Sequence, residues 1–548
     1  MKKILLSYIA FSILILTSCS ELDLEPRSAI TNSVYWKLPV DFQKACNELY
    51  FSLAFFPSDS YAETMSGQPL NNVSNGKYLA TANDGVWNNG YAYIRLANNV
   101  LEKYEASDIK SKIKASKGEA LFFRAYNYFS MYKRFGALPI VKTVLDINSP
   151  EVMRTRNPIY EVEDFMLADL DSAFVYLPKT ALAGDRGRIT QSVAMALKSR
   201  IALYAGTWAK YHGGRTDFND LLNKAVQAAY SVIASRNPTY KLFTGKGVDS
   251  YRYLFIEEGD DSQESILDNR FFYNIRTHGN TYGYAWGTSG FPTKKLADMY
   301  LCTDGLPIQK SPLFKGYGTT ISEYENRDPR MKMTFIVPGS SILTSEVSSP
   351  FIPPYSFSAR PETKTGYRFY KFIGEKYYTR VGLCEYDCRV IRYGEILLNY
   401  IEAKYEANGS VSDNDLEITI NLLRTRAGLS AKLTNSFVIA NGLNMLDEIR
   451  RERTIELVNE GFRYDDLRRW KIAENEMPQA LRGVKVKGTE WENLIDVSKL
   501  TLDDEGYVLI EPETERSFAV PKNYLFPLPL QQMSMNPNLK PNNPGWEL

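Results

Sequence analysis

The stretch that decides the fold is GEALFFRAYNYFSMYKRFGALP, residues 118–139. Its apolar side chains recur at intervals of four, three, four and three residues, at Leu121, Ala125, Tyr128, Tyr132 and Phe135. This spacing predicts an amphipathic helix, because side chains three and four residues apart lie on the same helix face. Gly136 and Pro139 end the helix, since glycine commonly terminates helices and proline cannot continue one.

A second helix of this kind is predicted from about 190 to 208, with Ala194, Leu197, Ile201 and Tyr204 on one stripe. Its small residues would let a neighbouring helix approach closely; they are Ala194, Ala196, Ala202, Ala205 and Gly206. The same periodicity predicts further helices near 41–56, 91–105, 160–176, 218–234, 390–407, 413–427 and 444–460.

These helices pair into hairpins, and pairs with a pitch of roughly 34 residues resemble tetratricopeptide repeats. The spacing between pairs is too irregular for a clean array. The predicted fold class is all-α dominated: a tetratricopeptide-like helical-hairpin superhelix with an irregular, loop-rich lobe inserted and a Pro-rich C-terminal tail.

Composition sets the boundaries of these parts. Between 237 and 389 short aromatic segments are broken by Gly, Pro, Ser and Thr, which indicates loops with a few short strands. The helical scaffold is predicted at about 40–236 and 390–475, and an irregular segment at 476–548, where prolines oppose regular helix. All of 19–548 is expected to form a single domain.

The first residues predict where the protein resides. Lys2 and Lys3 precede an apolar run, 4–16, of signal-peptide length. Leu16-Thr17-Ser18-Cys19 resembles a bacterial lipobox, which implies removal of residues 1–18 and lipidation of Cys19. The alternative is an ordinary cleaved signal with an accidental cysteine. The acidic stretch 20–23 also resembles the surface-export signal of Bacteroidetes lipoproteins.

Charge and composition argue for binding by stacking. Removing 1–18 leaves 63 basic against 64 acidic residues, so no global field attracts nucleic acid. The chain has 37 Tyr, 27 Phe and 7 Trp but only two histidines, His212 and His278, which are expected to form local hydrogen bonds. Aromatic faces suit sugar rings. Most of the tyrosines are nevertheless expected to pack helix against helix.

Metal and cofactor sites are not predicted. Cys384 and Cys388 are expected to form either a small disulfide loop or two independent thiols, since no further ligands for a zinc ion lie close in sequence. A calcium site at Asp260 and Asp261 is kept as an alternative, although no loop has a full EF-hand spacing.

The charged cluster from Arg450 to Trp470 could be read as catalytic, because glycoside hydrolysis needs two carboxyl groups across a sugar. The candidate carboxylates are Glu456, Glu460, Asp465 and Asp466. Glu456 and Glu460 lie one helical turn apart, with Arg453 and Arg463 nearby, which predicts structural ion pairs instead.

The order of motifs resembles the SusD/RagB family of Bacteroidetes outer-membrane lipoproteins, and the match extends over nearly the whole chain. The motifs are Cys19; Trp87 through Asn98-Asn99; Glu119 to Pro139; Gly187-Arg188-Ile189-Thr190 leading to Gly206; Arg450-Arg451-Glu452-Arg453 with Glu456, Glu460, Gly461, Arg463, Asp466, Leu467, Arg469 and Trp470; and Tyr524 to Pro529 with Asn536 to Leu539 and Asn543 to Trp546. The resemblance implies four tetratricopeptide-like units with an irregular lobe.

Two segments carry the aromatic and amide side chains that a glycan site needs. One contains Trp87, Asn88 and Tyr91 near a helix start, where Trp87 and Tyr91 could equally be packing anchors. The other contains Tyr282, Tyr284 and Trp286, which would project rings to one side if the segment were extended. Tyr61 is a weaker candidate.

The resemblance implies a non-enzymatic, surface-exposed lipoprotein of the outer membrane. It would capture an oligosaccharide or polysaccharide and deliver it to a SusC-like TonB-dependent transporter, without a cofactor. The alternatives are a peptide or another non-sugar nutrient as cargo, or a surface glycosidase.

Overall fold

The structure is a computed structural model that describes residues 35–67, 69–181, 186–287, 289–340, 363–376 and 382–547. The predicted signal peptide, residues 1–18, and Cys19 lie outside these ranges.

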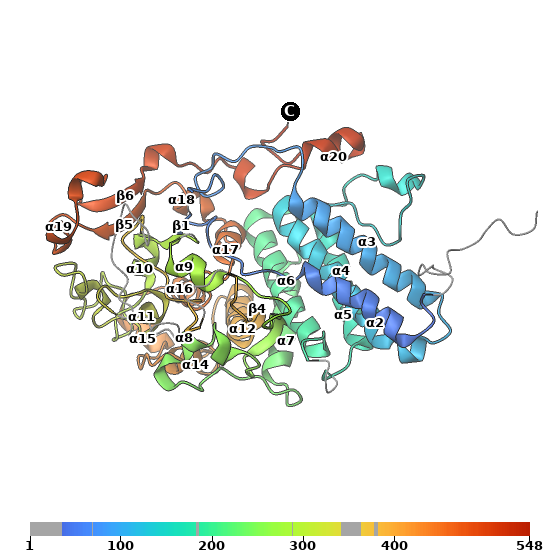
Figure 1. Ribbon diagram of the computed structural model, residues 1–548, viewed down its shortest axis with the longest axis horizontal. Helices are drawn as coiled ribbons and strands as arrows, with labels where there is room; N and C mark the ends of the chain where they lie inside the picture. The colour runs from blue at the N-terminus through green and yellow to red at the C-terminus, as the bar shows by residue number, and fades with distance from the viewer. Residues whose placement is uncertain are drawn as a thin grey trace, which may run out of the picture.

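A continuous row of helices starts on the right of Figure 1 with α3 to α5 and runs into the left half, where α12 and α16 lie, and each helix packs on the next. Antiparallel neighbours of this kind bury a shared apolar stripe. The helices of the row are α3 (Gly85–Glu105), α4 (Lys114–Phe135), α5 (Ile159–Tyr176), α6 (Gln191–His212), α7 (Phe218–Ile233), α12 (Tyr393–Asn408) and α16 (Met445–Glu456), with α2 (Pro39–Leu49) against α3 and α4.

The two helices predicted in most detail are confirmed. The predicted stripe of α4 is buried, and Gly136 ends the helix at a φ of 72°. Helix α4 is also buried on its other faces, at Phe122 and Phe123, because α2, α3 and α5 surround it. The small residues of α6 do allow close approach, since a Cβ on Gly206 would lie 2.9 Å from Leu222 of α7.

Several predicted helices have different bounds, and the one predicted near 41–56 ends at Leu49. Helix α3 begins at Gly85 and not at 91, with Asp84 as its N-cap, whose side chain accepts a hydrogen bond from the backbone nitrogen of Val86. The helix predicted at 413–427 is two helices, α13 (Asp413–Glu417) and α14 (Ile420–Arg426). Thr419 between them leaves the helical region, with φ −131° and ψ −94°.

The lobe holds short strands, as predicted, and short helices that were not predicted. Its strands pair antiparallel as β1 (Met65–Ser66) with β3 (Phe291–Pro292) and β2 (Ser265–Asn269) with β4 (Cys388–Arg392), so β1 brings the segment before α3 into the lobe. Its helices are α8 (Ser250–Tyr253), α9 (Asn280–Ala285), α10 (Lys294–Met299) and α11 (Arg330–Thr334).

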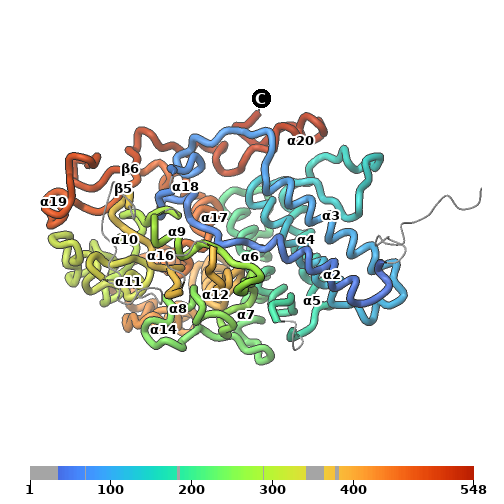
Figure 2. Tube along the Cα trace, viewed as in Figure 1, coloured from blue at the N-terminus to red at the C-terminus, as the bar shows by residue number. Residues whose placement is uncertain are grey.

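The C-terminal segment returns to the start of the helical row (Figure 2). The backbone nitrogen of Phe526 donates to the carbonyl of Arg134 at 2.8 Å, and the side chain of Asn543 donates to the carbonyl of Phe135 at 2.9 Å. The remaining elements are α15 (Asn435–Ala440), α17 (Arg463–Arg469), α18 (Ala473–Glu476), β5 (Leu481–Lys485) paired antiparallel with β6 (Tyr507–Glu511), α19 (Trp491–Leu494) and α20 (Leu530–Met535). None of the helices in the described part of the chain has the length and apolar character needed to cross a membrane.

Candidate functional site

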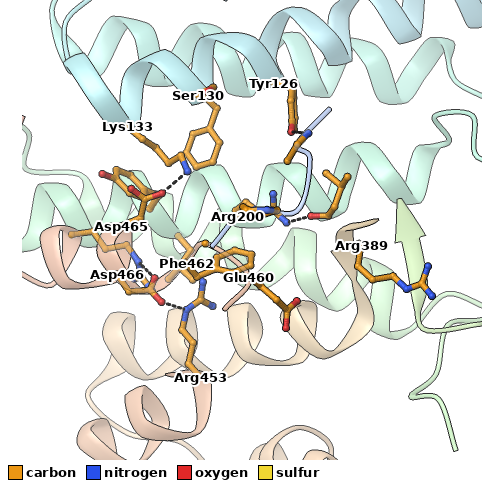
Figure 3. A pocket seen from close by; sticks show the side chains of 18 residues that line it. Tyr126, Ser130, Lys133, Arg200, Arg389, Arg453, Glu460, Phe462, Asp465 and Asp466 are labelled. Carbon is orange, nitrogen blue, oxygen red and sulfur yellow. Dashed lines mark hydrogen bonds and ion pairs between the residues drawn. The ribbon is translucent and has the colours of Figure 1, made fainter. Parts of the chain in front are cut away.

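A cavity of about 170 Å³ lies where α4 and α6 meet the turn between α16 and α17 (Figure 3). Lys133 of α4 pairs with Asp465, and Arg453 of α16 donates to Asp466 at 2.9 Å. The ring of Phe462 lies between two guanidinium groups, 5.1 Å from Arg200 and 5.4 Å from Arg453. We call this region, with the buried ion pairs behind it, the seam.

Glu456 is the most highly paired carboxylate of the seam. It accepts from Arg392 at 2.8 Å, from Arg330 at 3.1 Å and from Arg426. Burial alone would raise the pKa of Glu456, but Arg426, Arg392 and Arg330 outweigh it and lower the pKa to about 2.

Glu460 accepts from Arg392 at 2.8 Å and from Lys371 at 2.7 Å. The prediction of structural ion pairs is therefore confirmed, but its proposed partners were wrong. Arg453 pairs with Asp466, and Arg463 pairs with Glu63 at 2.6 Å. The true partners lie on distant segments, which helical spacing does not reveal.

The protonation of these carboxylates opposes glycosidase chemistry. A general acid needs a pKa raised towards neutrality. Burial opposes ionisation of Glu460 and Asp465, but Arg392 and Lys371 beside the first, and Lys133 and Arg468 beside the second, lower both pKa values. The predicted alternative of a paired-carboxylate hydrolase is not supported by this geometry.

The cysteines are independent thiols, so the alternative of a disulfide was wrong. Cys388 accepts from the backbone nitrogen of Phe56 at 3.1 Å, and burial raises its pKa to about 12. Among the described residues, no group of three His, Cys, Asp or Glu side chains could hold a metal ion. Asp260 and Asp261, the open calcium candidates, accept from Arg389 and Arg270 respectively, each at 2.9 Å.

Both histidines form the predicted local hydrogen bonds. Nε2 of His212 lies 2.8 Å from the carbonyl oxygen of Arg468, and Nε2 of His278 lies 3.0 Å from that of Tyr386. Burial lowers the pKa of His278 to about 4, so its ring is neutral near pH 7.

The two aromatic rings of the first candidate segment pack in the core. Trp87 is 5% exposed and packs edge-on against Phe135, with ring centroids 5.4 Å apart. Tyr91 donates to the carbonyl of Pro139 at 2.9 Å, and Asn88 is exposed. The structure therefore places the rings as packing anchors, while the binding role of this segment stays a prediction.

The second candidate segment was predicted as a loop that would project its rings to one side if extended, but it forms the helix α9. The helix turns Tyr284 inwards, where its ring stacks on Phe372 and its hydroxyl accepts from Asn459 at 2.7 Å. Tyr282 and Trp286 are half-buried and stack one helical turn apart, with centroids 5.9 Å apart and planes at 29°. We call these two rings the ring pair. Tyr61 is 38% exposed, edge-on to Tyr464.

A second cavity, of about 280 Å³, lies where the helical row meets the lobe, and it was not predicted. Four arginines line it: Arg186, Arg188, Arg270 and Arg276. The only local signals are RGR at 186–188 and RFFYNIR at 270–276, which gave no reason to expect that they meet. We call it the arginine cavity.

The described part of the chain thus combines a mostly helical fold with carboxylates buried in ion pairs and with aromatic rings that are only half-buried. The family model described as SusD family matches residues 253–546, more than half of the chain. A second model, described as starch-binding associating with outer membrane, matches residues 32–203. The chain belongs to the SusD family, as predicted. Members of this family are not enzymes, which agrees with the predicted absence of a catalytic site.

Relatives match along nearly their whole length. SusD-like protein P2 of Formosa agariphila is 25% identical over 572 aligned positions, covering 100% of both chains. A SusD-like protein of Bacteroides ovatus is 25% identical, covering 84% of this chain and 81% of that one.

Solved structures confirm the mostly helical fold. A SusD-like carbohydrate-binding protein of Bacteroides fragilis superposes with a TM-score of 0.74 at 21% identity, covering 92% of this chain and 99% of that one. Surface glycan-binding protein A of Bacteroides thetaiotaomicron, in complex with laminarihexaose, gives a TM-score of 0.62 at 17% identity, with 92% and 99% covered.

Proposed function

We propose that the protein captures glycans at the outer-membrane surface and that the ring pair is part of its binding site. The supporting observation is that Tyr282 and Trp286 stack side by side without being fully buried. Such rings offer flat apolar faces to the C–H faces of a sugar, and each stacked ring contributes about 0.5–1.5 kcal/mol beyond area burial, by analogy with aromatic pairs. The carbohydrate-binding and laminarihexaose-bound relatives support the same ligand class.

The remaining parts of the proposal concern architecture and delivery. The row of packed helices serves as a tetratricopeptide-like scaffold of a single domain, 19–548, and the loop-rich lobe carries the ring pair. Lipidated Cys19 anchors the chain to the outer membrane, and a SusC-like TonB-dependent transporter receives the glycan. Binding of micromolar to millimolar affinity suits a protein that hands its cargo on.

Calorimetric titration of the chain from residue 20 onwards tests the ligand class. The panel holds neutral, acidic and sulfated oligosaccharides, with laminarihexaose among the neutral ones, and a set of peptides. Replacing both rings (Tyr282→Ala with Trp286→Ala) should weaken glycan binding about tenfold, because two stacked faces are lost. Tyr160→Ala, at a tyrosine that is 45% exposed on α5, is the matched control and should bind as the parent does.

If the titration gives a heat of binding with peptides and none with saccharides, the cargo is a non-sugar nutrient. Glycan binding that survives loss of both rings would remove the ring pair from the site. For the anchor, Cys19→Ala should shift the protein from the membrane fraction to the soluble fraction, and affinity purification of the lipidated protein should recover the transporter.

A further inference from the structure

The arginine cavity lies between the end of α2 and the turn that follows β2. Phe51 lies at the edge of the cavity and is 60% exposed. In the turn that follows β2, Phe272 and Ile275 are 66% and 81% exposed. Large apolar side chains this exposed, gathered within two short segments, are typical of a binding surface.

The guanidinium groups of the cavity are not equally neutralised. Arg188 is matched by Glu119 in a bidentate pair of 2.9 and 2.8 Å, and Arg389 is shared between Asp268 of the wall at 3.2 Å and Asp260 at 2.9 Å. The other three arginines of the cavity differ in how far carboxylates neutralise their charge.

Arg186 and Arg270 share a single carboxylate, Asp261, at 2.8 and 2.9 Å. The other carboxylate near Arg270 is Asp387, at 3.7 Å; burial and the neighbouring Asp260 and Asp268 raise its pKa to about 7, so it is only partly ionised near neutral pH. The carboxylates of this region therefore gather around Arg270 and Arg389, away from Arg276.

Of the four arginines that line the cavity, Arg276 has no ion pair with any described residue. Within the described ranges, no carboxylate lies within 4.0 Å of its guanidinium, which donates to Oδ1 of Asn269 at 2.5 Å. Its guanidinium lies 4.4 Å from the ring centroid of Phe271 and 5.9 Å from that of Phe51. A half-buried guanidinium fixed in this way keeps free donors for an oxyanion such as a carboxylate or a sulfate.

We propose that the arginine cavity binds an acidic saccharide, with the sugar ring on Phe51 and its anionic group on Arg276. The shared chemistry is a pyranose that carries a carboxylate or a sulfate. This inference rests on the proposed function and deepens it by naming the class of glycan. Arg270 adds long-range attraction. The exposed side chain of Asn47 accepts from Arg188 at 2.7 Å through its amide oxygen and presents its amide NH2 to sugar hydroxyls.

The test is titration of the same chain with hexagalacturonate, a sulfated carrageenan tetrasaccharide and laminarihexaose. At least one acidic ligand should bind tenfold or more tightly than laminarihexaose, and its affinity should fall as salt is added. Arg276→Ala should weaken that binding at least tenfold and change laminarihexaose binding less than twofold. The matched control is Arg236→Ala, at an exposed arginine outside the cavity, which should leave both affinities unchanged.

Phe51→Ala provides a second variant that breaks no ion pair and should weaken acidic-saccharide binding about threefold. The carboxylate and sulfate ligands distinguish the two sources of the anionic group. Acidic binding that is unchanged in both variants, or no stronger than neutral binding, overturns this inference. If neutral glycans still bind through the ring pair, the proposed function stands without it, whereas silence with every saccharide overturns both.

Discussion

The early helices of the row, α4 to α6, and the seam are both buried, but different chemistry stabilises them. Most of the side chains that α4 and α6 bury are apolar, as at Phe122 and Leu197, with a few polar exceptions such as Ser199 and the Arg124–Asp169 pair. In the seam, Arg330, Arg392 and Glu456 are as deeply buried as those apolar side chains. An apolar layer tolerates imperfect matches, whereas a buried charge destabilises the fold strongly once its partner is removed. The row therefore depends on shape, and the seam depends on the presence of every partner.

The largest effect is expected in the seam. Glu456→Ala should lower the free energy of unfolding by about 4 kcal/mol, because Arg392 and Arg426 lose a buried partner. Urea denaturation followed by circular dichroism measures it. Glu417→Ala breaks a surface pair with Lys432 and should leave the free energy of unfolding nearly unchanged, because solvent screens that pair. Equal losses for the two variants would contradict the comparison.

The next effect belongs to the helical row. Trp87→Ala should lower the free energy of unfolding by about 3 kcal/mol, since it leaves a cavity against Phe135. The same denaturation experiment applies, and titration of the folded variant should show parental glycan affinity. If the variant is as stable as the parent but no longer binds glycan, Trp87 is a binding residue and not a packing anchor.

Acid should weaken the seam selectively. The pKa of Glu456, about 2 when folded, lies below its ordinary value of 4.5, so its stabilising contribution is complete above pH 4.5 and is lost as the pH falls towards 2. On this basis Glu456 alone accounts for a loss on the order of 2 kcal/mol between pH 6 and pH 3.

Denaturation midpoints measured between pH 7 and pH 3 test this loss. Glu456→Gln, which cannot titrate, should start from a lower stability and lose less of it on acidification. An unchanged pH dependence in this variant would mean that other groups govern acid sensitivity.

The smallest effect lies where the two regions meet. Tyr204 of α6 lines the cavity of the seam, and its buried hydroxyl has no hydrogen-bond partner among the described residues. Tyr204→Phe should change the free energy of unfolding by less than about 1 kcal/mol. Tyr132→Phe is the matched control and should cost more, because that hydroxyl donates to Glu163 at 2.6 Å.

The same contrast explains what the sequence could predict. The helices follow from spacing within ten residues, so α4, α6 and their neighbours were found. The partners of Glu456 could not be found, because Arg392 and Arg330 lie 64 and 126 residues away. Helix α9 was misread for a related reason. Its glycine-rich sequence favours a loop, but the contacts of Tyr284 with Phe372 and Asn459 hold it as a helix. The arginine cavity likewise needs segments that only the fold brings together.

The return of the C-terminal segment to the helical row has a consequence for the order of folding. Asn543 and Phe135 are 408 residues apart, yet their hydrogen bond secures the end of α4. Contacts of such sequence separation form late, because a long loop must close before they are made. A chain made from its N-terminus can assemble the helices early, but the row is completed only after residues 526–543 have emerged. Until then the end of α4 is open to water, to chaperones and to proteases.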